Sequence, residues 1–348
     1  MSEYVFAVLF STLGAGIVTV FASSHWLIAW IGLEVTTLAI LPLMAKDYTA
    51  RTVEAATKYY LAQSIGAAMI VFAALSNAWI SGQWTINELS HPLPSILMIL
   101  ALSLKLGLVP LHGWVPEVLQ GLKLHTGMIL ATFQKLAPFA LLVQMQHLHP
   151  QLLAGLGFLS ILWAGLAGHN QAQLRKILAY SSISHMGWMT VILAYSTPLA
   201  YFAFIMYLLM TFTLFQMFNL STATSINMLT NAWSRSTMVL GLVPFILLTL
   251  AGLPPLSGFM PKLCATEELT KQGLIFLVTC ALLVTLLSFY YYLRLTYAIT
   301  MAAFPNAYPG CTFWRFLEKN KIVPLSLAMS ASISFAPITP ILLSLLNS

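Results

Sequence analysis

Charged side chains are scarce in this chain: they make up 7% of its 348 residues, whereas 59% of the residues are hydrophobic. An ordinary soluble domain has about a quarter charged residues, so this composition excludes a water-soluble surface. The apolar residues fall in runs of about 20, which at 1.5 Å per residue cross a hydrocarbon core about 30 Å thick. The composition therefore predicts an all-α, polytopic transmembrane helix bundle.

Cysteine is also rare, and the chain has only Cys264, Cys280 and Cys311. No pair of them has CxxC or another metal-ligand spacing, and an odd number argues against a disulfide framework. We interpret them as packing residues. No two of the eight histidines lie four residues apart in one span, the spacing that metal and haem sites in helix bundles usually need. The sequence therefore predicts no bound metal or cofactor.

Eleven spans follow from the apolar runs and from the Pro, Gly and charged residues between them. They are predicted at 4–22, 26–45, 57–80, 93–112, 125–145, 150–169, 175–196, 199–220, 238–256, 273–296 and 324–346. The carboxyl-terminal span is an extra one beside two sets of five. We therefore predict a single membrane domain with a first half-repeat at 1–146, a second at 147–303, and a loop with the last span at 304–348.

The basic residues gather on one side of these spans. The loops after every second span hold Lys46, Arg51, Lys58, Lys123, Arg175, Lys176, Arg235, Arg315, Lys319 and Lys321. The opposite loops hold essentially Lys271 alone. The positive-inside rule then places the amino terminus inside and the carboxyl terminus outside. The net charge of +6 is accounted for by this topology and gives no reason to expect nucleic acid.

One broken segment occurs twice, at Lys105–Glu117 and at Leu250–Lys262. Gly107, Leu108, Pro110, Leu111, Gly113 and Pro116 recur as Gly252, Leu253, Pro255, Leu256, Gly258 and Pro261. The copies end the fourth and ninth spans, so the five-span repeats are inverted with respect to each other. Paired Gly/Pro-interrupted helices of this kind indicate a transport site.

Ionisable side chains inside the apolar spans are the next candidates. By helix rise, Lys135 lies about 15 Å from either end of its span, Glu34 about 12 Å and Lys105 about 10 Å, beyond the roughly 6 Å reach of a lysine stem. Such charges normally face a protein interior or water and mark ion pathways. Lys262, just past the second break, is a further candidate. Arg294, near a span end, is more simply explained by snorkelling.

The breaks lie beside these lysines. Pro110 has no N–H, so the carbonyl of Leu106, next to Lys105, loses its helical partner. Pro138 frees a carbonyl beside Lys135 in the same way. A single proline would more simply indicate a packing kink, but two breaks beside buried lysines favour local hydration, because irregular backbone at membrane depth must be satisfied by protein or a wet cavity.

These residues suggest a proton path. Burial disfavours the charged form of a lysine and a nearby carboxylate favours it, so Glu34 could load or discharge Lys105 as the two move together or apart. His112 and His185 could relay protons, although each could equally be a hydrogen-bonded packing residue. The serines before His185, at 181, 182 and 184, could orient water, but bonding back to helix carbonyls is the simpler reading.

With these residues placed, the chain resembles the antiporter-like membrane subunits of respiratory complex I, in a short vertebrate form that lacks three amino-terminal helices. The family is related to subunits of multisubunit sodium/proton antiporters. The resemblance rests on Ser23–Trp26, Trp30–Glu34, Glu54–Tyr59, Ser81–Trp84, Trp114–Val118, Gln134–Pro138, Gln173–Ser182, His185–Trp188, Gly252–Leu256 and Tyr292–Arg294. The carboxyl-terminal fifth matches mainly by hydropathy.

The resemblance implies a subunit that moves protons across the mitochondrial inner membrane while other subunits oxidise NADH and reduce ubiquinone. It implies that FMN, iron–sulfur clusters and the quinone site belong to those subunits. Partners would be the other core and accessory subunits, especially neighbouring antiporter-like subunits, with lipids such as cardiolipin. The amino terminus would face the matrix and the carboxyl terminus the intermembrane space.

By motif, Glu34 resembles the glutamate that faces the lysine at 105, Lys135 the central lysine, and Lys262 the exit-half lysine of a hydrated polar axis that joins the three lysines. The chain departs from the family pattern after Lys262, where Leu-Cys-Ala-Thr precedes two glutamates instead of tryptophan and an apolar run. Two other functions stay open: a secondary sodium/proton antiporter without redox chemistry, and a structural scaffold of the membrane arm.

Overall fold

The computed structural model describes residues 3–46, 48–86, 88–89, 91–234, 237–302, 319–334, 339, 341 and 344, and these residues are helical almost throughout. The prediction of an all-α fold is confirmed. The chain divides into two compact units, Met1–Gly157 and Phe158–Ser348. Arg235, Cys311 and Arg315, which the topology and packing predictions include, lie outside the described residues.

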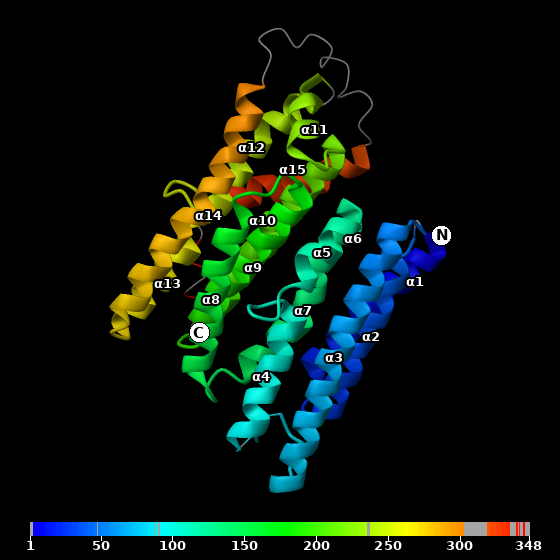
Figure 1. The fold of residues 1–348 in the computed structure, drawn as a ribbon, viewed down its shortest axis with the longest axis vertical. Helices are drawn as coiled ribbons and strands as arrows, with labels where there is room; N and C mark the ends of the chain where they lie inside the picture. The colour runs from blue at the N-terminus through cyan, green and yellow to red at the C-terminus, as the bar shows by residue number, and fades with distance from the viewer. Residues whose placement is uncertain are drawn as a thin grey trace. The chain divides into compact units, whose positions relative to one another are not determined.

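The first unit (Figure 1, blue to green) is built from seven helices in the part of it that the structure describes. They are α1 (Glu3–Ala22), α2 (Trp26–Met44), α3 (Ala50–Ser81), α4 (Pro92–Leu106), α5 (Trp114–Gly121), α6 (Leu124–Ala131) and α7 (Phe133–Gln144). Helix α2 packs against α1 and α3, α3 against α4, and α7 against α1, α2 and α4. Most side chains of α4, α6 and α7 are buried.

Helix α8 (Pro150–Gly168) runs across the division between the units. The second unit (Figure 1, green to red) then contains α9 (Leu174–Leu193), α10 (Thr197–Ser221), α11 (Ile226–Asn231), the 3-10 turn η1 (Ala232–Ser234), α12 (Thr237–Ala251), α13 (Phe259–Lys271), α14 (Ile275–Met301) and α15 (Lys319–Ser334). Helix α10 packs against α9, α12, α13 and α15, and α14 packs against α12 and α13.

Seven helices or helix pairs in the described residues are long and apolar enough to cross a membrane, which confirms a multi-span membrane protein. They are α1, α2, α3, α6 with α7, α8, α10 and α14. Helix α4 and residues 239–251 of α12 are apolar but shorter, because each stops at a break. Helix α9 has the length of a span but carries Arg175, Lys176 and several serines. The total of eleven spans stays a prediction.

A matched pair of backbone contacts occurs in the two units. In the first, Trp26 N–H donates to Trp84 O at 3.1 Å and Ile86 N–H to Ser24 O at 3.1 Å. In the second, Leu174 N–H donates to Thr224 O at 3.1 Å and Ile226 N–H to Ala172 O at 3.2 Å. In each unit, the residues just before the second long helix thus pair with the loop after the third.

Candidate functional site

The first break follows Lys105 at the end of α4. Gly107 has φ +77°, a left-handed conformation that glycine adopts without strain. Its N–H donates to Leu104 O at 3.1 Å, and Leu108 N–H donates to Ser103 O at 2.9 Å, which closes the helix in the manner of a Schellman cap. The helix therefore ends at Leu106, before Pro110. The predicted span of 93–112 is helical only in its first part, because glycine, and not the proline, stops the helix.

A second donor stabilises this helix end. Trp114 Nε1 donates a hydrogen bond of 2.9 Å to Leu104 O. This carbonyl lies in the last turn of α4, where carbonyls lack the usual helical partners. The indole belongs to the first residue of α5, so the same contact fixes the start of the next helix against the break.

Lys105 is buried, with 3% of its surface exposed. Its Nζ donates to Gln63 O of α3 at 3.4 Å, a long hydrogen bond to a backbone carbonyl. Burial of Lys105 agrees with its predicted place inside the bundle. The acceptor, a main-chain oxygen of another helix, has no sequence signature and was not predicted.

Glu34, on α2, is half-buried and makes no ion pair with Lys105 among the described contacts. Its Oε2 accepts from Thr37 Oγ1 at 3.4 Å, while its Oε1 is buried and has no hydrogen-bond partner among the residues that the structure describes. The carboxylate is near enough to act electrostatically on Lys105 and on the fully buried Tyr59. The structure therefore shows the two groups as neighbours, with the lysine turned to a carbonyl.

Lys135 lies in the first turn of α7 and is 5% exposed. The helix is interrupted just before it, at Thr132, whose φ of −112° and ψ of −75° separate α6 from α7. The Thr132 N–H and Oγ1 both donate to Met128 O, at 3.0 and 2.7 Å, and Lys135 N–H turns to Thr132 O at 3.3 Å. Pro138, predicted to mark the break, lies inside α7. The interruption thus lies on the amino-terminal side of Lys135, and not at Pro138 on its carboxyl-terminal side.

Several polar side chains of the first unit are buried near its two buried lysines. Gln134, beside Lys135, donates through Nε2 to Thr36 Oγ1 of α2 at 3.4 Å. Gln63 Nε2, like Glu34 Oε1, is buried without a partner among the described residues. Since buried polar atoms are nearly always hydrogen-bonded, unpartnered atoms on α2 and α3 beside two buried lysines are typical of a site that binds internal water.

The second break repeats the first at the end of α12. Gly252 has φ +83°, and its N–H donates to Leu248 O at 3.1 Å and to Thr249 O at 3.0 Å. Here the added donor is a lysine: Lys262 Nζ bonds to Ala251 O, the last carbonyl of α12, at 2.8 Å. A Cβ on Gly252 would lie 2.9 Å from that Nζ, so the glycine also makes room for the amine.

Lys262 lies between two cavities of the second unit. A cavity of about 340 Å³ is lined by α12, α13 and α14, including Gly252, Thr266 and Thr285. A small one of about 20 Å³ is lined by Lys262, His185 and Tyr207, among other residues. The structure thus brings His185 and Lys262, which were predicted separately from the sequence, to one cavity.

The position that matches Lys262 in the first copy has a different role. Glu117, in the first turn of α5, pairs with Lys58 of α3 at 2.8 Å, and both side chains are exposed. Exposed pairs of this kind contribute little stability. His112 lies in the turn between α4 and α5, half-buried, and its carbonyl accepts from Val115 N–H at 3.0 Å. The two breaks therefore have similar backbone conformations but different charged side chains.

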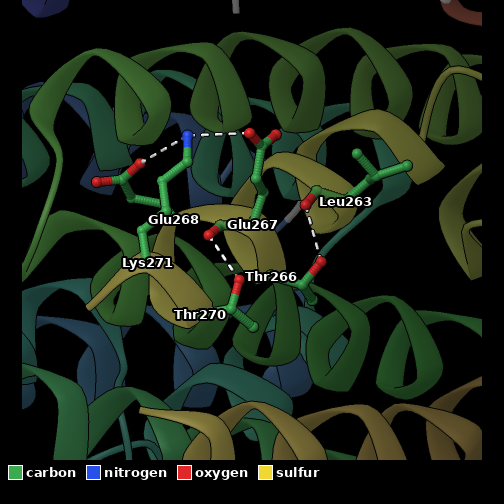
Figure 2. Close-up of polar contacts among 6 residues, drawn as sticks. All are labelled: Leu263, Thr266, Glu267, Glu268, Thr270 and Lys271. Carbon is green, nitrogen blue, oxygen red and sulfur yellow. Dashed lines mark hydrogen bonds and ion pairs between the residues drawn. The ribbon is translucent and has the colours of Figure 1, made fainter. Parts of the chain in front are cut away.

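The far end of α13 carries the acidic residues that depart from the family pattern. Figure 2 shows Lys271 between two carboxylates, with Nζ 2.9 Å from Glu267 and 4.0 Å from Glu268. The hydrogen bond that Lys271 donates to the Glu267 carboxylate raises the pKa of Lys271. Thr266 and Thr270 donate to Leu263 O and Glu267 O, each at 2.8 Å. Both acids are thus paired with Lys271, an exposed residue at the end of α13.

The serines before His185 follow the simpler prediction. Ser181, Ser182 and Ser184 are buried and donate to Leu178 O, Ala179 O and Ser181 O, each at 2.8 Å. Arg294 Nη1 donates to His169 O at 2.9 Å at an exposed position. Sequence reasoning missed a role for Trp114 and for three buried tyrosines, Tyr207, Tyr291 and Tyr292. The last two belong to a run of tyrosines at 290–292 in an apolar helix, which was a visible signal.

Comparison with known families gives two matches that together cover most of the chain. Residues 23–288 match the family described as NADH:quinone oxidoreductase/Mrp antiporter, transmembrane. Residues 289–343 match the family described as NADH dehydrogenase subunit 2 C-terminus. The chain is 51% identical over 347 residues to NADH-ubiquinone oxidoreductase chain 2 of Tetraodon nigroviridis, with 100% of both chains covered. It is 51% identical over 346 residues to that of Formosania lacustris, with 99% of both covered.

Solved structures give the same fold. A chain of respiratory complex I from Thermus thermophilus is similar with a TM-score of 0.86 and 25% identity, over 99% of this chain and 80% of that one. A chain of the Mrp complex from a Dietzia species is similar with a TM-score of 0.80 and 15% identity, over 97% of this chain and 76% of that one. The second likeness concerns the fold alone.

Proposed function

The chain belongs to the chain 2 family of NADH-ubiquinone oxidoreductase, the antiporter-like membrane subunits of respiratory complex I, and we propose that its buried lysines carry protons across the membrane. It is a membrane-arm subunit of that enzyme. The observation that carries the proposal is the pair of broken helices, each with a buried or half-buried lysine at the break.

The proposed path in the first unit uses Glu34, Lys105 and Lys135. Lys105 Nζ donates a long hydrogen bond to a carbonyl, and one oxygen of Glu34 has no partner within the described part of the chain. A small movement could therefore exchange the carbonyl for the carboxylate. The carboxylate would favour the charged amine and the carbonyl alone would favour it less. Alternation between these contacts would load the lysine with a proton and release it.

In the second unit the proposed path uses Lys262 and His185, which line one cavity. In the first unit, His112 is the proposed relay beside the first break. The amine of Lys262 could likewise exchange its hydrogen bond to Ala251 O at the end of α12 for contacts inside the cavity that Lys262 lines. The polar axis that joins the three lysines is part of this proposal and follows from the family. The matched hydrogen bonds of the two units support the proposed half-repeats at 1–146 and 147–303.

The proposed setting is the mitochondrial inner membrane, with the amino terminus in the matrix and the carboxyl terminus in the intermembrane space. The one-sided distribution of basic residues supports this orientation. NADH, FMN, the iron–sulfur clusters and ubiquinone are proposed to bind other subunits, which supply the redox energy. Neighbouring antiporter-like subunits and lipids such as cardiolipin are the proposed contacts.

Replacement of Lys135 by methionine tests the function. Met fills a similar volume without a charge, so the assembled enzyme of a genetically tractable relative should keep its fold but lose proton transfer. We expect NADH:quinone turnover and proton pumping in vesicles to fall by about a hundredfold or more, in the range of a lost acid–base group.

Two outcomes would contradict this proposal. An assembled Lys135→Met enzyme that pumps as many protons per NADH as wild type would favour a structural scaffold. Cation-dependent proton exchange by the isolated chain in liposomes, without NADH, would favour a secondary sodium/proton antiporter.

A further inference from the structure

Three tyrosines of the second unit are buried and have no role in the path described above. Tyr207 on α10 and Tyr291 and Tyr292 on α14 are 2%, 1% and 2% exposed. A phenol hydroxyl in an apolar interior costs free energy unless it finds a hydrogen-bond partner. Phenylalanine would pack equally well at these positions, so the hydroxyls require an explanation.

The three hydroxyls converge on the serines of α9. The Tyr207 hydroxyl interacts with Ser182, Tyr291 with Ser184, and Tyr292 with Ser181. The rings of Tyr291 and Tyr292 are themselves 4.5 Å apart between centroids. We call the six residues the hydroxyl cluster; its members are Ser181, Ser182, Ser184, Tyr207, Tyr291 and Tyr292.

The hydroxyls of Tyr291 and Tyr292 are buried among these polar neighbours. Neither phenol oxygen makes a hydrogen bond of regular distance and angle with the described residues. Each serine already donates its proton to a carbonyl of its own helix and offers only its lone pairs. Buried polar oxygens without a direct partner of regular geometry are typical of positions that bind internal water.

One end of the cluster meets the path at His185. The His185 ring lies 5.8 Å from that of Tyr207 between centroids, and both line the small cavity that Lys262 also lines. Tyr207 therefore links the cluster to the cavity that His185 and Lys262 line.

The other end meets the loop that follows α8. A Cβ on Gly168 would lie 2.9 Å from the Tyr291 ring, so the end of α8 packs directly against that ring. His169 comes next, and its ring stacks on Tyr290 at 4.9 Å. Its Nε2 is buried without a partner among the described residues. This loop leads to the basic residues at the start of α9, on the predicted matrix side.

We propose that the hydroxyl cluster is a hydrated branch of the proton path that connects the loop at 169–173 with His185 and, through it, with Lys262. The inference rests on the proposed function, since it assigns protons to a path that the lysines define. A hydroxyl or water accepts a proton from one neighbour as it passes its own to the next. One proton enters and one leaves, so no group is oxidised or keeps a charge.

The sequence offers a matched control for this branch. Tyr290, Tyr291 and Tyr292 are consecutive, but Tyr290 is 55% exposed and stacks on His169. A change of tyrosine to phenylalanine removes one oxygen and keeps the ring. The double variant Tyr291→Phe with Tyr292→Phe therefore removes the two unpartnered hydroxyls, while Tyr290→Phe removes a hydroxyl that the branch does not use.

The variants are compared in the assembled enzyme of a genetically tractable relative with the same residues, reconstituted in vesicles. We expect the double variant to assemble normally and to lower turnover and pumping about two- to tenfold, the factor of one lost hydrogen bond. Tyr290→Phe should match wild type. Should the double variant not assemble, Ser181→Ala with Ser184→Ala removes hydroxyls of the same branch and is expected to lower both rates equally.

The branch is wrong if the assembled double variant, or the serine pair that replaces it, behaves like Tyr290→Phe. Lys135→Met in the same assay separates this result from failure of the proposed function. A slow Lys135→Met enzyme beside a normal tyrosine double variant would overturn the branch alone. Normal pumping by both would overturn the proton path and the branch together.

Discussion

At the scale of single residues, the amine of Lys262 holds the end of a helix and faces two cavities at once. A cation is favoured at the carboxyl end of a helix because the last carbonyls carry partial negative charge. The bond to Ala251 O therefore stabilises the charged amine in one position, at 2.8 Å. Release of the proton would weaken this bond and allow the side chain to move. Lys262 is thus suited to couple its charge to its position.

Gly252→Ala tests this arrangement. At φ +83° an alanine is strained by roughly 1 to 2 kcal/mol, and its Cβ would lie 2.9 Å from Lys262 Nζ. We expect the amine to be displaced and proton pumping per NADH to fall, with a lower midpoint of thermal inactivation. Gly241→Ala, on the same helix, adds a Cβ with no atom within 4 Å and should leave both values unchanged. Equal pumping by the two variants would contradict the role of the cap.

The burial of Lys105 and Lys135 could be predicted because helix rise gives the depth of a residue within an apolar run. The hydrogen-bond partners of these lysines could not be predicted from the sequence. The acceptor for Lys105 is the backbone oxygen of Gln63, and every residue has such an oxygen. The meeting of His185 with Lys262 depends on how α9, α10 and α13 pack, which a single sequence does not encode in any local pattern. The functional roles of these residues stay predictions.

At the scale of helices, each break is held by a side chain from the helix that follows it. Trp114 Nε1 caps α4 and Lys262 Nζ caps α12. The Trp114→Phe variant keeps an aromatic ring but removes the donor, so the end of α4 should open more often. We expect amide hydrogen exchange at residues 104–108 to rise about fivefold, as for a hydrogen bond of about 1 kcal/mol. Trp79→Phe, which is 91% exposed before the change, should leave it unaltered.

The position of the breaks was only partly predictable. Proline was the visible signal, but Gly107 ends α4 before Pro110 is reached. Thr132 separates α6 from α7 on the amino-terminal side of Lys135, whereas Pro138 lies on its carboxyl-terminal side. Hydropathy continues through both positions, since it measures composition and not backbone angle. A threonine that bonds back to the carbonyl four residues earlier is common inside helices, so its sequence gives little warning of a break.

At the scale of the whole molecule, the repeat visible in thirteen residues extends to the backbone of both units. The order of long helices, the paired loops and the glycine-ended broken helix all occur twice. The copies differ in charge: Lys105 has a counterpart in Leu250, and Lys262 in Glu117. A shared backbone with different charges is what two halves with different steps in one transport cycle would require.

An inverted relation between the halves makes a definite prediction for topology. The predicted spans place five crossings between Lys123 and Lys271, an odd number, so these two exposed residues should lie on opposite sides of the membrane. We expect a membrane-impermeant thiol reagent to label Lys123→Cys from the matrix side and Lys271→Cys from the other, in a chain whose three cysteines are replaced by serine. Labelling after detergent treatment shows that neighbouring subunits do not hide either site. Labelling of both cysteines from one side would contradict an odd number of crossings and with it the inverted repeat, whereas a reversed pattern would keep the repeat and overturn only the predicted orientation.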